Sequence, residues 1–232
     1  ATGYGQSVTT PWLALSHEFL PRHVAYASWG QGAESDVTPN RARYTNAGQA
    51  LPSLKSRQVE LGVKGQSDGL RWALAYFDIR RPVSSDLGSD CFDDTTGGTC
   101  TRQFDGNARH RGLEGGAHWD IGPWRLSGSA MWLHARREGA ADAGLNGKRP
   151  VNVPAHRVKA GVDYRVAALP GLRLAGAMVH EGDRMVLADN SVHIPSWTRF
   201  DVGLVHLQRV GGTTLTWRAG IDNLTDKRAW RE

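Results

Sequence analysis

The stretch HRVKAGVDYRV, residues 156–166, decides the fold class of this chain. From Val158 to Val166, apolar and aromatic residues occupy every second position, and Lys, Gly, Asp and Arg lie between them. A period of two is that of a β-strand, because successive side chains point to opposite faces. So regular an alternation indicates a strand with apolar surroundings on one face and water on the other.

The same construction recurs along the chain. A Leu-Pro-Gly turn at 169–171 leads into a second alternating stretch at 172–180, and together they predict a hairpin. Further strand pairs are expected at 12–20 with 23–29, 58–66 with 70–79, 111–121 with 124–134, and 199–210 with 213–221. The sequence thus predicts about ten strands. Long irregular segments separate the hairpins, near residues 31–55, 82–103, 136–155 and 182–196.

Short turns that alternate with long loops are typical of a transmembrane β-barrel. We therefore predict an all-β fold, an antiparallel transmembrane β-barrel fragment with short periplasmic turns and long extracellular loops. Charged and small residues on the second face of each strand suit a water-filled or plugged lumen. A soluble β-sandwich is the alternative, although such a fold rarely needs loops of this length.

Composition agrees with a barrel without requiring one. No run of 18 apolar residues occurs in the 232, which excludes a transmembrane helix. The mean hydropathy of -0.45 fits a soluble protein and also a barrel, whose two faces average to a polar value. Nine Trp favour a membrane interface, where an apolar ring with one polar N–H is at home. The net charge of +5 is spread along the chain, which argues against a compact nucleic-acid patch.

Candidate metal and redox groups are few. Cys91 and Cys100 close a short Gly-rich segment, which favours a disulfide formed in an oxidising compartment. The nine His are scattered without defensible ligand spacing, so we expect no metal site and no cofactor. The acidic segment with Asp90, Asp93 and Asp94 lacks the spacing of a Ca²⁺ loop.

No enzyme is predicted. The sequence contains neither a nucleophile elbow nor a phosphate-binding loop. Ser127, Ser129 and His134 share one predicted strand, but parity places His134 on the face opposite both serines.

Several segments, in order along the chain, resemble the barrel of TonB-dependent receptors. The first has Glu60, Gly62 and Lys64 on one strand and Phe-Asp-Ile, residues 77–79, at the end of the next. The others are Arg-Gly-Leu-Glu at 111–114, Val-Pro-Ala-His-Arg at 153–157, Ile-Pro-Ser-Trp-Thr at 194–198 and Asp-Asn-Leu-Thr-Asp-Lys at 222–227. The last departs from the family's Asn-Leu-Phe-Asp-Lys at Thr225. The spacing and the Ile-Pro-Ser-Trp segment look most like ferric-siderophore receptors.

This resemblance implies a barrel of about 22 strands closed by an N-terminal plug. Residues 1–232 would be the C-terminal part of that barrel, without the plug, the early strands and the last strand. It further implies TonB-dependent active transport of a ferric siderophore across the outer membrane of a Gram-negative bacterium. The implied partners are the siderophore, the TonB–ExbB–ExbD system acting through the absent plug, and outer-membrane lipid and lipopolysaccharide, with no nucleic acid. A secreted carbohydrate-binding β-sandwich and a passive porin-like barrel remain alternatives.

Binding of an iron chelate would rest on aromatic surfaces and cationic groups. Candidate contacts lie on the long loops and at the outer ends of strands: Trp29, Arg43, Tyr44, Arg102, Phe104, Arg136 and Arg137. Exposed Arg has an alternative role in contacts with lipopolysaccharide phosphate or with water. Trp124, Trp132 and Trp217 lie on apolar strand faces, and we expect them in an interfacial girdle.

Overall fold

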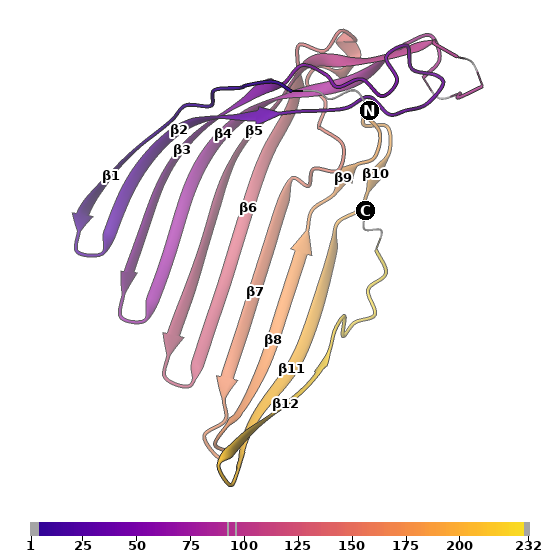
Figure 1. Ribbon diagram of the computed structural model, residues 1–232. Helices are drawn as coiled ribbons and strands as arrows, with labels where there is room; N and C mark the ends of the chain where they lie inside the picture. Colours follow the sequence, from indigo (N-terminus) through magenta and orange to yellow (C-terminus); the bar gives the residue numbers. More distant parts are fainter. Residues whose placement is uncertain (1–4, 92, 96, 230–232) are drawn as a thin grey trace.

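A computed structural model describes residues 5–91, 93–95 and 97–229. These residues form one sheet of ten antiparallel strands and a separate two-stranded hairpin (Figure 1). The sheet contains β1 (Trp12–Leu20), β2 (His23–Glu34), β3 (Leu54–Ser67), β4 (Leu70–Gly88), β5 (Cys100–Ile121), β6 (Trp124–Glu138), β7 (His156–Arg165), β8 (Leu172–Glu181), β11 (Trp197–Val210) and β12 (Thr213–Ile221). The hairpin consists of β9 (Arg184–Met185) and β10 (His193–Ile194), and a short 3-10 turn spans Ala143–Leu145. Among the described residues, no helix is long and apolar enough to cross a membrane.

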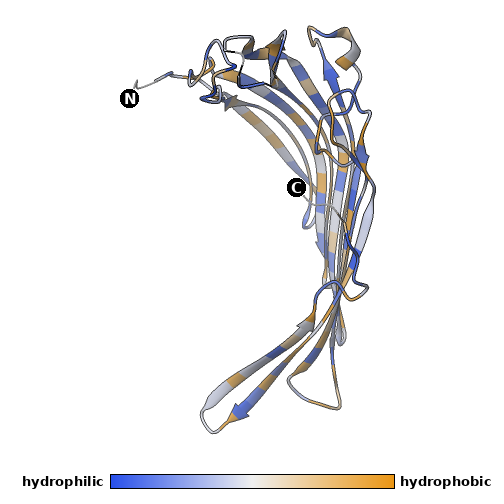
Figure 2. Ribbon diagram, turned by 90° about the vertical axis from the view of Figure 1, so that its right-hand side faces the viewer, coloured by the Kyte–Doolittle hydropathy of each residue, from blue (hydrophilic) through white to orange (hydrophobic). Residues whose placement is uncertain are grey.

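Each strand of the sheet pairs with the next one along the chain, and β8 pairs with β11 across the small hairpin. Short turns lie at one end of the sheet and long connections at the other (Figure 1). The predicted strands and the alternation of turns and loops are therefore confirmed. The strands form a single curved sheet in which each strand neighbours the next (Figure 2). A β-sandwich would instead pack two sheets face to face, so the sandwich alternative is not supported. In the described part of the chain β1 and β12 do not pair with each other, so the sheet is open.

The loop boundaries expected between β4 and β5 were wrong. These strands continue to Gly88 and begin at Cys100, so only residues 89–99 connect them instead of 82–103. A register shift between Pro82 and Ser84 interrupts the alternation, and polar residues dominate beyond it. The extension lacks the apolar face by which a membrane strand is recognised, and cross-strand polar pairs hold it instead.

The two faces of the sheet differ sharply in chemistry. On β7 and its neighbours, the register places Val162 on the same face as Leu126 and Leu174, with no protein layer over them. On this apolar face, Leu61 is 52% exposed and Leu113 is 49% exposed. Exposed apolar area of this extent is typical of a surface that contacts lipid. The opposite, polar face carries the hollows of the sheet, as expected for the inside of a curved wall.

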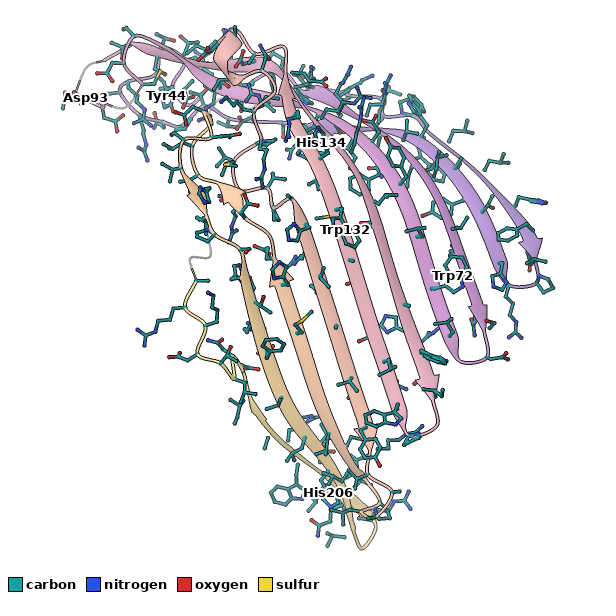
Figure 3. The ribbon with its side chains drawn as sticks, turned by 180° about the vertical axis from the view of Figure 1, so that it is seen from behind. Tyr44, Trp72, Asp93, Trp132, His134 and His206 are labelled. Carbon is teal, nitrogen blue, oxygen red and sulfur yellow. A yellow bond between two sulfur atoms is a disulfide. The ribbon has the colours of Figure 1, made fainter. Side chains whose placement is uncertain are left out.

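Aromatic residues bound the apolar face at two levels. Trp132 lies toward the long loops and Trp72 toward the short turns (Figure 3). The register places Tyr76 at the level of Trp132, and Trp119 and Trp124 next to the short turns. Beyond Trp132 the same face becomes polar, with His134 as the next outward residue on β6. The predicted girdle positions of Trp124 and Trp132 therefore agree with the edges of an apolar band.

Candidate functional site

The candidate site is the loop end of the sheet, where the long connections gather (Figure 3). The connection 35–53 folds back onto the extensions of β4 and β5. Its central residue is Tyr44, which is 4% exposed. The Tyr44 hydroxyl donates a hydrogen bond to Asp86 Oδ2 at 2.8 Å. A loop residue is thus buried against a strand pair far from it in sequence.

Cations flank the Tyr44 ring. The guanidinium carbons of Arg43 and Arg102 lie 5.1 and 5.7 Å from the ring centroid, within the range of a cation–π contact. Arg102 also holds Asp86 with two hydrogen bonds, of 2.7 and 3.0 Å. This bidentate contact and the Tyr44 hydroxyl lower the pKa of the Asp86 carboxyl from its ordinary value, because both stabilise the carboxylate.

Main-chain bonds complete the attachment. The fully buried Cys100 donates its amide to Arg43 O at 2.9 Å, and its carbonyl accepts from the Thr45 amide at 2.7 Å. Cys100 is also disulfide-bonded to Cys91, which closes the β4–β5 connection. We call Arg43, Tyr44, Asp86, Cys100 and Arg102 the loop brace. It fixes connection 35–53 as an added strand-like segment on the end of β5.

The other two long connections are joined to each other. Arg149 in connection 139–155 donates to Asp183 Oδ2 at 2.7 Å and to Asp183 O at 2.6 Å. Asn190 accepts from the Arg149 amide and donates to its carbonyl, at 2.8 and 2.9 Å. Val151 forms a parallel bridge with Met185. The loop end therefore contains two separately braced units.

A hollow of about 410 Å³ lies between these units. Phe104, from the predicted set, lines it together with Arg81, His110 and Val151. Arg81 is paired at 2.6 Å with Glu34, whose side chain lines the same hollow. Burial lowers the pKa of His110, and the neighbouring Arg81 cation adds to this effect. The hollow, which we call the mouth hollow, offers an aromatic surface, an imidazole and paired charges to a ligand.

The remaining predicted residues lie elsewhere. Trp29 pairs with Leu13 and Val59, so it belongs to the apolar face and not to the lumen side. Arg137 is 11% exposed and bonds Asp105, which is 3% exposed, at 3.0 Å. Arg136 shares the outer side of the sheet with Arg109, opposite which it lies in the register. The structure thus brings together Arg43, Tyr44 and Arg102, but not the whole predicted set.

Sequence reasoning missed the polar row that follows the apolar band on the outer side. There Asp78 pairs with Arg109 at 2.5 Å and with Arg111 at 3.2 Å, and Glu138 pairs with Arg80 at 3.1 Å. The available signal was strand parity, since Asp78 is two residues beyond Tyr76 on the same face. This row marks where the apolar surface ends.

On the polar face, the Tyr26 hydroxyl donates to Glu60 Oε1 at 2.6 Å. Glu114 and Lys159 line a hollow there with Tyr26. Among the described residues, no group of three or more His, Cys, Asp or Glu could hold a metal ion. The described polar face is therefore lined by charged and hydroxyl-bearing side chains, among them Tyr26, Glu60, Glu114 and Lys159.

Comparisons with known proteins identify relatives over nearly the whole chain. The family model described as TonB dependent receptor-like, beta-barrel, matches residues 1–224. The ferrichrome receptor FcuA of Yersinia enterocolitica is 31% identical over 222 residues, which is 95% of this chain and 27% of that protein. The ferric preacinetobactin receptor BauA of Acinetobacter baumannii is 29% identical, with a TM-score of 0.79, over 95% of this chain and 32% of its own. The ferric yersiniabactin uptake receptor FyuA of Yersinia pestis shares the fold, at 18% identity and a TM-score of 0.72, over 94% of this chain and 32% of its own.

Proposed function

Because the chain belongs to the TonB-dependent receptor β-barrel family, we propose that it is the C-terminal part of the barrel of an outer-membrane ferric-siderophore receptor. The identity with a ferrichrome receptor, 31% over 95% of the chain, carries this proposal. The chain spans about a third or less of the relatives that it matches, so binding and transport belong to a longer protein. In that protein the long loops face the outside and the short turns the periplasm.

The proposed activity is transport without covalent chemistry. A ferric siderophore binds at the loop end, and the TonB–ExbB–ExbD system supplies the energy that moves a plug out of its path. The apolar face supports placement in the outer membrane of a Gram-negative bacterium, because its exposed Leu and Trp residues form a band with aromatic edges. The role is that of a receptor and not of an enzyme.

We assign the chelate contact to the mouth hollow, with Phe104 as the aromatic surface and Arg81 and His110 beside it. Of the predicted contacts, Arg43, Tyr44 and Arg102 support this wall through the loop brace, since Tyr44 is buried and Arg102 is neutralised by Asp86. Arg137 stabilises the neighbouring connection through Asp105. Trp29 and Arg136 face the membrane side, where Arg136 is suited to lipid or lipopolysaccharide phosphate.

Uptake of radioactive iron tests the proposal. The gene for the complete receptor is deleted from an iron-starved host and then restored, and cells receive iron-loaded ferrichrome, a catecholate chelate and a mixed-ligand chelate in turn. We expect receptor-dependent binding and uptake of at least one chelate, and loss of uptake with retained binding in cells without TonB. Failure to bind any of the three chelate classes would overturn the siderophore assignment.

Substitutions test whether the chelate binds at the mouth hollow or at the outer face. Phe104→Ala in the complete receptor should weaken chelate binding about tenfold, as expected for loss of one stacked ring worth about 1.4 kcal/mol. Phe200→Ala is the matched control, because Phe200 lies on the apolar face opposite Met178 and is 41% exposed. Equal chelate affinity in both variants would contradict the assignment of the chelate contact to the mouth hollow.

A further inference from the structure

Two imidazoles face each other on the outer side of the sheet, at the loop end of β7 and β8. His156 Nε2 and His180 Nε2 are 3.1 Å apart, and the ring planes are inclined by only 16°. His156 is two residues beyond Val158 on its strand, and His180 is the register partner of Val158. The pair therefore lies at the edge of the apolar band, and both rings are half-buried. Water reaches this level of a barrel, because the apolar band ends here.

Neighbouring groups orient both rings. His180 Nδ1 is 2.8 Å from Thr198 Oγ1 on β11. When His180 Nδ1–H donates to this hydroxyl, His180 Nε2 carries a lone pair directed at His156. The His156 ring lies over Gly182, where a Cβ atom would approach two of its ring atoms to 2.9 Å. The absence of a side chain at position 182 thus provides the space for the His156 ring.

The separation of the two nitrogens suits a shared metal ion. Two ligands each about 2.0–2.1 Å from one ion, at angles between a right angle and a tetrahedral angle, lie roughly 2.9–3.4 Å apart. A hydrogen-bond acceptor at the second ring nitrogen commonly orients a metal-binding His, and the Thr198 hydroxyl occupies that position beside His180. Imidazole nitrogens prefer Zn²⁺, Cu²⁺ and Ni²⁺ over Mg²⁺ and Ca²⁺.

We propose that His156 and His180 form a binding site for a divalent transition-metal ion on the outer side of the barrel. The ion takes the place of the proton between the two Nε2 atoms, and the neutral His156 ring then carries that proton on Nδ1. Water molecules complete the coordination, because no third His, Cys, Asp or Glu among the described residues joins the pair. The site is separate from the mouth hollow and does not depend on which chelate the receptor carries.

A bound ion would join two strands near their loop end. His180 lies in the antiparallel ladder of β7 with β8, and His156 continues this ladder by accepting a hydrogen bond from the Gly182 amide at 2.8 Å. An ion bound only to the folded sheet stabilises it in proportion to the logarithm of the free ion concentration. We therefore expect the ion to raise the thermal midpoint of the complete protein.

The test uses the complete receptor in detergent micelles, first stripped with a chelator. Cu²⁺ is titrated while electron paramagnetic resonance reports nitrogen ligands, and Zn²⁺ stoichiometry is measured in parallel. We expect His156→Ala and His180→Ala each to lose one equivalent of bound metal and the corresponding nitrogen coupling. His134→Ala and His206→Ala are controls, since both residues lie on the outer side but outside the pair.

A further variant keeps both imidazoles. Gly182→Ala should displace the His156 ring and lower metal affinity at least tenfold, while heat-modifiable gel migration shows that the barrel is still folded. Unchanged stoichiometry and nitrogen coupling in both His variants would overturn the proposal. Full affinity in Gly182→Ala would overturn the assigned geometry of the His156 ring.

Discussion

At the scale of single residues, partners decide what a charged side chain does. Arg102 and Tyr44 have the chemistry of chelate contacts, but Asp86 occupies both of them. Residue type was enough to select Arg43, Tyr44 and Arg102 as candidate chelate contacts. Their contact with one another depends on connection 35–53 folding back onto β4 and β5, which residue type does not reveal. Asp86 could have been found only by extending β4 and β5 to a cross-strand pair between Asp86 and Arg102.

Asp86→Asn should loosen the loop brace at neutral pH, because the amide keeps the shape but loses the charge that Arg102 binds. A charge-assisted hydrogen bond is worth about 1.5 kcal/mol, so local opening should increase roughly tenfold. Trypsin cleavage after Arg41 in the complete protein measures this opening. Asp94→Asn is the control, because the Asp94 contacts with Arg41 and Arg43 are longer, at 3.6 and 3.5 Å, and the Asp94 side chain is about half-exposed.

The effect of Asp86 also depends on pH in a defined direction. Its folded-state pKa lies below the ordinary 3.8, so the folded protein takes up this proton less readily than the unfolded chain. The stabilisation is therefore complete above pH 3.8 and is lost as pH falls through the folded-state value. Hydrogen exchange of residues 43–46 should differ between the parent and Asp86→Asn at pH 6, and the difference should shrink on acidification below 3.8. A constant difference would contradict the role of the Asp86 charge.

At the scale of elements, alternation predicts membrane strands but not their extensions. β7 was predicted almost to its ends because Val158 to Tyr164 show an uninterrupted period of two. The outer parts of β4 and β5 have no such signal, since polar residues dominate there and the register shifts beyond Pro82. The bracing of connection 139–155 by Asn190 was equally invisible, because it joins two irregular segments.

Removal of the disulfide tests how the β4–β5 connection is held. Cys91→Ser with Cys100→Ser should cost about 2.5 kcal/mol of stability in this region, by the loss of loop closure. Because Thr45 donates to Cys100 O, exchange of the Thr45 amide should accelerate together with that of residues 89–99. The amides of β7 and β8 serve as an internal control and should keep their protection. Unchanged hydrogen exchange at Thr45 would show that the disulfide does not stabilise the loop brace.

At the scale of the whole molecule, the face on which a residue lies determines whether a charged substitution is tolerated there. Ala160 pairs with Gly128 and Met178 near the middle of the apolar band, whereas Ala177 lies on the polar face opposite Asp201. Ala160→Arg should cost about 2–4 kcal/mol at a bilayer midplane. Ala177→Arg should be tolerated, since a carboxylate is across from it. Folding yield of the complete protein in lipid vesicles measures both, and equal yields would contradict the assignment of the faces.

The spacing of the aromatic rows on β6 has a consequence for the choice of bilayer. Trp124 and Trp132 are eight residues apart, which is about 26 Å along a strand and roughly 20 Å along the membrane normal at a barrel tilt. Such a height falls short of the hydrocarbon thickness of an average bilayer, about 30 Å. Hydrophobic mismatch should therefore favour short-chain phospholipids, which match the height of the band without local thinning.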